Sequence, residues 1–196
     1  MSGRTYTVLL SAFFAAGCRI DARTDALGED NVRYGLGHAV DSTRLASLDI
    51  DITPSGAGLP AGSGSAAQGQ GVYAASCASC HGVNGEGLPP NPPLLGGPRG
   101  SFDFAGNPKM LKTIGNYWPY ATTLFDYIRR SMPLTAPGSL TADQTYAVTA
   151  YLLEREQVIP AGTVLDATSL PKVAMPARDH FVPDDRAGSR GGKNVK

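Results

Sequence analysis

The segment Cys77-Ala78-Ser79-Cys80-His81 places two thiols and an imidazole within five consecutive residues. This Cys-x-x-Cys-His spacing is typical of the attachment site of a c-type haem. The two thiols can form thioethers with the haem vinyl groups, and His81 follows at the position of an axial iron ligand. The spacing therefore predicts one covalently bound haem c held by Cys77, Cys80 and His81.

Paired cysteines also occur in redox-active disulfides and in zinc sites. A thioredoxin-type motif is expected within a β-α-β unit, and a zinc site needs two further ligands at short spacing. The sequence around residues 77–81 shows neither of these features. The haem interpretation is therefore favoured.

An iron that only transfers electrons takes a second axial ligand, for which His and Met are the common donors. The candidates in this chain are Met110, Met132, Met175, His38 and His180. Met132-Pro133 lies in a turn between two expected helices, from which a loop can present its thioether. Met110 and Met175 are better explained as packing residues, and both histidines lie in polar segments expected to face solvent. We therefore predict that the iron is ligated by His81 and Met132.

A ligating histidine usually donates its other ring N–H to a carbonyl group. Pro93 is our candidate acceptor, because it lies in a proline-rich loop over residues 88–97 in which several carbonyls lack competing local donors. Trp118 and Tyr120 are candidate hydrogen-bond donors to a haem propionate. Each is explained equally well as a core aromatic residue.

Local patterns predict that helices position these residues. Gly69, Tyr73 and Cys77 recur every four residues and so share one face of a helix that leads into the haem motif. Thr141-Ala142-Asp143-Gln144 is a capping box that opens a helix continuing to about Glu156. Further helices are expected at 42–48, 108–114 and 122–130, whereas Asn116 to Tyr120 reads as a poor helix sequence. No segment shows the alternation typical of a strand.

The composition suits a small helical domain whose loops wrap a cofactor. Lys and Arg total 17, as do Asp and Glu, so no net field favours nucleic acid or an anionic membrane surface as a partner. Gly (24) and Pro (15) are abundant in the 196 residues, which indicates many turns.

The amino terminus resembles an export signal. Arg4 precedes the apolar stretch 8–16, which is too short for an ordinary transmembrane helix. Ala15-Ala16-Gly17-Cys18 resembles a bacterial lipobox, with Ala15 where Leu is usual, so Cys18 is a candidate for lipidation; ordinary cleavage near Gly17 is the alternative. The predicted organisation is a lipoprotein-type signal peptide at 1–17, an extended arm and linker at 18–67, a folded domain at 68–159, and an extended tail at 160–196 that is partly disordered.

The chain from Gly69 to about Ile159 resembles class I cytochrome c. The haem motif follows a helix that carries Gly69 and Tyr73, and Met132-Pro133 resembles the distal ligand of that family. The segment Pro93-x-Leu95-x-Gly97 resembles its haem-packing loop, so Pro93 and Leu95 are expected to contact the cofactor. The resemblance implies an all-α fold around one covalently bound haem, here with an extended N-terminal arm and C-terminal tail.

A longer pattern is similar to the cytochrome subunit of sulfur-oxidising (Sox) sulfane dehydrogenases and of related sulfite dehydrogenases. It comprises 113–130, 136–141, 146–153 and parts of the arm and tail, and covers most of residues 34–184. Some members carry a second haem domain, which this sequence lacks, and Cys18 implies a tether. The resemblance implies a partner, a molybdenum-cofactor dehydrogenase that oxidises sulfite or sulfane sulfur.

These patterns predict an electron-transfer protein that is not itself an enzyme. It would accept electrons from the molybdenum-dependent dehydrogenase and pass them to a downstream cytochrome c or oxidase, in the periplasm and with a membrane anchor at Cys18. The alternative is an independent membrane-tethered cytochrome c that carries electrons between a respiratory complex and a terminal oxidase or reductase. A haem enzyme or sensor with an open distal site is a third hypothesis, against which Met132 argues.

Overall fold

The computed structural model describes residues 39–97 and 100–182 of the chain. The chain divides after Ser42 into two units, and only residues 39–42 of the first are described. Helix α1 (Ser42–Leu48) buries none of its residues and confirms the helix expected there. The predicted signal peptide, Cys18 and His38 lie outside the described residues.

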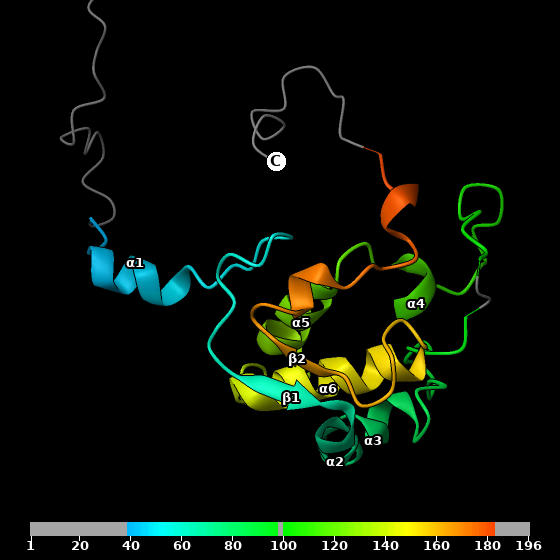
Figure 1. Ribbon diagram of the computed structural model, residues 1–196, viewed down its shortest axis with the longest axis horizontal. Coiled ribbons are helices and arrows are strands. Elements are labelled where there is room, and N and C mark those ends of the chain that lie inside the picture. The colour runs from blue at the N-terminus through cyan, green and yellow to red at the C-terminus, as the bar shows by residue number, and fades with distance from the viewer. Residues whose placement is uncertain (1–38, 98–99, 183–196) are drawn as a thin grey trace, which may run out of the picture. The chain divides into compact units, whose positions relative to one another are not determined.

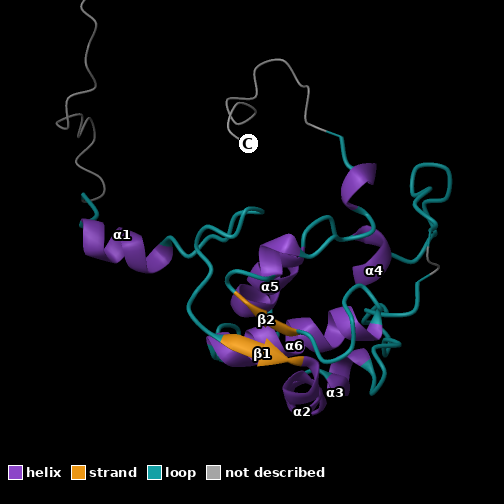
Figure 2. Ribbon diagram, viewed as in Figure 1, coloured by secondary structure: helices purple, strands orange, loops and turns teal. Residues whose placement is uncertain are grey.

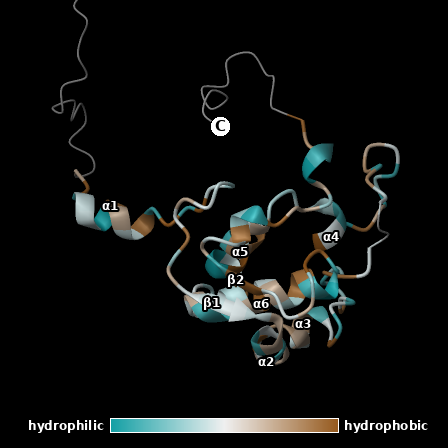
Figure 3. Cartoon of the chain, in the orientation of Figure 1, coloured by the Kyte–Doolittle hydropathy of each residue, from teal (hydrophilic) through white to brown (hydrophobic). Residues whose placement is uncertain are grey.

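Three longer helices form the core of the second unit. They are α2 (Ala66–Ser76), α5 (Ala121–Ser131) and α6 (Ala142–Arg155), and α6 contacts both of the others (Figure 1). Every residue of α6 from Thr145 to Leu153 is buried. The hydropathy colouring shows apolar stretches on α5 and α6 (Figure 3). The core therefore surrounds α6, as the predicted all-helical fold requires.

Side-chain caps fix where two of these helices begin. At α6 the Thr141 amide donates to Gln144 Oε1 (2.9 Å) and the Gln144 amide donates to Thr141 Oγ1 (3.2 Å), which confirms the predicted capping box. Ser65 and Gln68 make the same reciprocal bonds at α2. Each pair satisfies amide groups that the first helical turn would leave without partners.

Helices α2 and α6 approach closely at Gly69. A Cβ atom at this position would overlap the carbonyl of Ala147 and would lie 2.8 Å from Cβ of Tyr151. One turn further along α2, the Tyr73 ring lies 5.2 Å from that of Tyr151. The absence of a side chain at Gly69 therefore allows the backbones to meet and the two tyrosine rings to come into contact.

The Gly69→Ala variant is expected to lower the free energy of unfolding by about 1–3 kcal/mol, because the helices must separate to admit the methyl group. Gly71 is the matched control, since it lies on the same helix, is exposed and has nothing within 4 Å of its position. Gly71→Ala is expected to be neutral or to stabilise by up to about 1 kcal/mol. Denaturant unfolding of the haem-loaded proteins, followed by far-UV circular dichroism, measures both. Equal effects of the two substitutions would contradict the close crossing.

A two-stranded antiparallel sheet lies against α6 (Figure 2). Its strands are β1 (Ser63–Ser65) and β2 (Val164–Asp166), with Gly64 opposite Leu165. Gly64 also meets Ala147 of α6 so closely that a side chain would not fit. The sequence analysis expected no strand, because three-residue strands that contain Gly and Ser carry too little alternation to be recognised.

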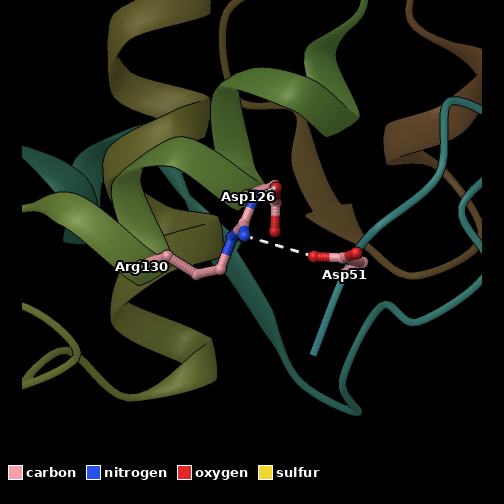
Figure 4. Close-up of polar contacts among 3 residues, drawn as sticks. All are labelled: Asp51, Asp126 and Arg130. Carbon is pink, nitrogen blue, oxygen red and sulfur yellow. Dashed lines mark hydrogen bonds and ion pairs between the residues drawn. The ribbon is translucent and has the colours of Figure 1, made fainter. Parts of the chain in front are cut away.

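The arm is fixed to the domain from Asp51 onward. Arg130 of α5 pairs with Asp126 one turn earlier on its helix and with Asp51 of the arm, at 3.2 Å (Figure 4). Ile52 is buried beside this pair, and the Tyr146 hydroxyl donates to the carbonyl of Pro60 at 2.9 Å. The second half of the arm and linker predicted over 18–67 therefore packs against the domain.

The tail also contributes to the core. After β2 it forms two short 3-10 helices, η1 (Leu170–Lys172) and η2 (Arg178–His180), and buries Leu165, Leu170 and Met175. The described part of the tail, to residue 182, therefore packs into the folded domain, which the sequence analysis had placed at 68–159. The end predicted to be disordered lies outside the described residues.

One predicted helix is wrong. The sequence analysis placed a helix at 108–114, where the structure has turns and extended backbone. The helix in this region is α4 (Ile114–Tyr117), and the Thr113 amide at its start donates to Asn116 Oδ1 at 2.7 Å. Asn116, taken as unfavourable to a helix, is in fact the residue whose side chain supports its first turn.

Candidate functional site

The Cys-x-x-Cys-His segment forms a separate turn of helix after α2. Helix α2 ends at Ser76, and α3 (Ala78–His81) follows Cys77. The amides of Cys80 and His81 both donate to the Cys77 carbonyl, at 3.1 and 3.0 Å. Gly82 ends the turn with a positive φ of 79°. The turn thus places both thiols and the imidazole next to one another on a compact backbone.

Tyr73 supports this turn from α2. Its hydroxyl donates to the carbonyl of Gly82 at 2.8 Å, so the residues before and after the motif are joined. Burial raises the pKa of Tyr73 to about 12, and the phenol therefore remains a donor at neutral pH. Tyr73 is a supporting residue that the sequence indicated only as a member of the helical face.

The motif opens onto an apolar cavity of about 440 Å³. Ligand pockets in proteins commonly measure about 300–1,000 Å³, so the cavity is large enough for a cofactor. Its walls come from α2, α3, the 91–94 loop, the 112–114 segment, α5, the 132–135 turn and α6. The lining residues are Tyr73, Ser76, Cys77, Ser79, Cys80, His81, Asn91, Pro92, Pro93, Leu94, Lys112, Thr113, Ile114, Trp118, Leu124, Tyr127, Ile128, Met132, Pro133, Leu134, Thr135, Val148 and Leu152.

The cavity brings together six of the residues predicted from the sequence. Cys77, Cys80 and His81 lie along one part of its lining, and Pro93, Trp118 and Met132 contribute to the rest. Cys77 and Cys80 are free thiols, so both are available for covalent attachment. Burial, and to a smaller extent the charge of Cys80, raises the pKa of Cys77 to about 11. A catalytic thiol-disulfide motif instead needs a lowered pKa, so this thiol does not have the electrostatics of a redox-active disulfide.

The His81 side chain has the properties of a metal ligand. Burial lowers its pKa, against a smaller opposing effect of the Pro92 carbonyl, so the neutral imidazole is favoured. Nδ1 is buried and makes no well-formed hydrogen bond. The carbonyl that acts on this ring is that of Pro92, the neighbour of the predicted Pro93, which itself lines the cavity.

Met132 is the only one of the described candidates for the distal ligand that lines the cavity. It follows α5 directly, and its amide still donates to the Ile128 carbonyl at 3.0 Å, so the end of the helix fixes its position. Met175 is buried in the core, and the Met110 thioether accepts a hydrogen bond from Ser101 at 3.5 Å. His180 stacks on Phe102 with ring centres 3.8 Å apart.

Two predicted site residues lie outside the cavity lining. Leu95 is buried behind the wall, where its side chain occupies the space that a side chain at Gly85 would need. Tyr120 precedes α5, and its ring faces the guanidinium of Arg178 at 5.4 Å. Leu95 therefore supports the loop, and Tyr120 contacts Arg178 of the tail.

Several site residues were missed in the sequence analysis. Glu156 is buried at the end of α6, and its Oε1 accepts from the amide of Gly96 at 2.8 Å, which fastens the loop beside the cavity. Lys112 and Thr113 line the cavity just before α4, and Tyr127 lines it from α5. Helical spacing placed Tyr127 beside the recognised apolar residues Leu124 and Ile128, whereas no local signal marked Lys112 or Glu156.

The residues present fit a covalently attached haem. The site offers two thiols for attachment, one neutral imidazole, one thioether and otherwise mainly apolar walls. Among the described residues there is no group of three or more His, Cys, Asp or Glu side chains that could hold a metal ion directly. The described helices also include none with the length and apolar character needed to cross a bilayer.

Comparison with known proteins agrees with this geometry. The family model for cytochrome c matches residues 66–156. The solved structure of the sulfane dehydrogenase SoxCD from Paracoccus pantotrophus contains a similar chain: the two are 38% identical, the match covers 83% of this chain and 78% of that one, and the TM-score is 0.67. A comparison with curated protein sequences finds no match.

Proposed function

The chain belongs to the cytochrome c family, and from this premise we propose that it is a mono-haem electron-transfer subunit of a sulfur-compound dehydrogenase. Haem c, when bound, supplies an iron that takes up and releases one electron at a time. The proposed axial ligands are His81 and Met132. The finer assignment rests on one observation above all, that one cavity gathers the attachment motif and a single methionine of the described candidates.

The chain's own residues have separate tasks in this proposal. Cys77 and Cys80 hold the cofactor covalently, so it cannot be lost when partners exchange. His81 and Met132 would ligate the haem iron and would leave no site on it for substrate, which suits electron transfer and not catalysis. The apolar side chains of α5 and α6, among them Ile128, Val148 and Leu152, exclude water and favour the less charged, reduced state.

The proposed electron donor is a molybdenum-dependent dehydrogenase that oxidises sulfite or sulfane sulfur. The similarity to the SoxCD chain covers 83% of this protein, whereas the cytochrome c model covers only residues 66–156. The similarity therefore extends into the arm and tail. Oxidation of the sulfur centre releases two electrons on the partner, and this chain would pass them on singly to a downstream cytochrome c or oxidase.

We further propose that the protein works in the periplasm, tethered through Cys18. The proposed covalent haem attachment and an amino-terminal sequence that resembles an export signal support that compartment. The alternative, an independent tethered carrier between a respiratory complex and a terminal oxidase or reductase, uses the same haem site. The two proposals differ in the electron donor and in whether the chain is a subunit of that donor.

Reconstitution distinguishes the donors. The oxidised holoprotein, mixed with a purified molybdenum-dependent sulfite or sulfane dehydrogenase from the same organism and excess sulfite or a sulfane-sulfur substrate, is expected to become reduced within the mixing time of the assay, as seen in its visible spectrum. Omitting the dehydrogenase should abolish the reduction. Reduction by a quinol-oxidising complex, with none by the dehydrogenase and either substrate, would overturn the proposed donor and support the independent carrier.

A further inference from the structure

Lys112 is the one permanently charged side chain among the described residues that line the cavity. The remaining lining residues are apolar or neutral polar groups, and His81 is neutral for the reason given above. Lys112 forms no ion pair within the described part of the chain. Lys112 is exposed at the edge of the cavity, so its charge is free to meet an anionic group of a ligand that fills the cavity.

Aromatic rings hold the Lys112 ammonium group in place. Nζ lies 4.7 Å from the centre of the Tyr117 ring and 5.8 Å from that of Phe104. Phe104 in turn contacts Tyr117 edge to face at 5.4 Å. The cation is therefore positioned by its surroundings.

The next residue supplies a second polar group, a hydroxyl that donates to no acceptor. Thr113 is buried, with 2% of its surface exposed, and lines the same cavity. Its Oγ1 faces the Asn116 amide in the capping box at the start of α4, but the hydroxyl donates to no acceptor. A buried hydroxyl without an acceptor is costly, and a ligand that accepts a hydrogen bond would remove that cost.

We propose that Lys112 and Thr113 bind one propionate carboxylate of the haem, Lys112 as counter-ion and Thr113 as hydrogen-bond donor. The inference rests on the proposed haem site. It assigns the carboxylate subsite to the segment before α4, in place of Tyr120, which the structure turns toward the tail. Trp118 also lines the cavity and therefore stays a candidate hydrogen-bond donor to a propionate.

The subsite would tune the reduction potential. A cation near the haem favours the reduced state, which carries one positive charge fewer, and it also keeps the nearby carboxylate ionised. Removing Lys112 should therefore lower the potential. It should also raise the pKa of the carboxylate, and so move the pH range in which the potential changes to higher pH.

The test compares Lys112→Gln with Lys109→Gln in the holoprotein. Lys109 is exposed, lies three residues earlier and does not line the cavity, so its loss changes the net charge equally. At a fixed applied potential, Lys112→Gln is expected to lower the ratio of reduced to oxidised protein about tenfold, a fall of about 59 mV for one electron. Lys109→Gln should change this ratio less than twofold, and Lys112→Arg should retain most of the wild-type value.

The pH dependence of the reduction potential shows whether Lys112 acts on a carboxylate or only through its general effect on the net charge. Lys112→Gln and Thr113→Val should both shift the pH-dependent range of the potential upward, whereas Lys109→Gln should not. The other titratable side chains that line the cavity are Tyr73, Tyr127, His81 and the two cysteines, and no Asp or Glu is among them. Thr113→Ser keeps the hydroxyl group, so its potential should depend on pH as in the wild-type protein.

Identical potentials and pH profiles for the two glutamine variants would overturn the subsite. Failure of the wild-type protein to carry covalent haem, seen in its visible spectrum after acid–acetone extraction, would instead overturn the proposed function. Lys112 is exposed, so its replacement should leave folding intact.

Discussion

Replacing both Cys77 and Cys80 with Ser is expected to abolish covalent haem. Serine hydroxyls do not form thioethers with vinyl groups, so the cofactor would be held only by the axial ligands and by the cavity walls. The wild-type protein should keep its haem through acid–acetone extraction, and the double variant should lose it completely. The emptied cavity should also lower the unfolding temperature, because a bound group stabilises only the folded state.

Cys18→Ser is the matched control, since it makes the same chemical change at the third cysteine of the chain. It should leave the haem content unchanged after extraction. Single replacements of Cys77 or Cys80 should leave at most one thioether and an altered visible spectrum. Haem that resists extraction from the double variant would contradict attachment at this motif.

Replacing Met132 with Ala is expected to open the distal side of the haem. The loss of the thioether should lower the reduction potential on the order of 0.1–0.2 V, within the range of about 0.8 V over which axial ligands act. It should also allow the reduced protein to bind carbon monoxide, which the wild-type protein should resist. Redox titration and the visible spectrum under carbon monoxide measure the two effects.

Met110→Ala provides the comparison for this variant. Met110 is half-buried and lies outside the cavity lining, so its loss should change neither the potential nor carbon monoxide binding. If Met132→Ala left both properties unchanged, Met132 would not be the ligand, and an open distal site would bring back the hypothesis of a haem enzyme or sensor.

The parts of the fold that were predictable depend on local chemistry. The Thr141 capping box defines the start of α6 by hydrogen bonds within four residues, and the apolar spacing of α5 indicates its buried face directly. The haem motif is likewise contiguous. The position of Met132 could be predicted because a helix ends immediately before it, so the chain there must form a turn.

The parts that were missed depend on contacts between distant segments. Gly64 is in a strand because it fits against Ala147 and pairs with Leu165, and nothing in its neighbours signals either contact. Glu156 reads as an ordinary charged residue at a helix end until Gly96 is placed beside it. The contact between Tyr120 and Arg178 was not predicted for the same reason, because the two residues lie far apart in the sequence.

The pairing of β1 with β2 has a consequence for the order of assembly. The ladder joins segments that precede and follow every residue assigned to the haem site. Closing so long a loop is slow and unfavourable until the enclosed chain, which carries Cys77 to His81, is compact. We expect haem attachment to take place on a chain whose ends are still apart, with the sheet as the last step that locks the finished protein.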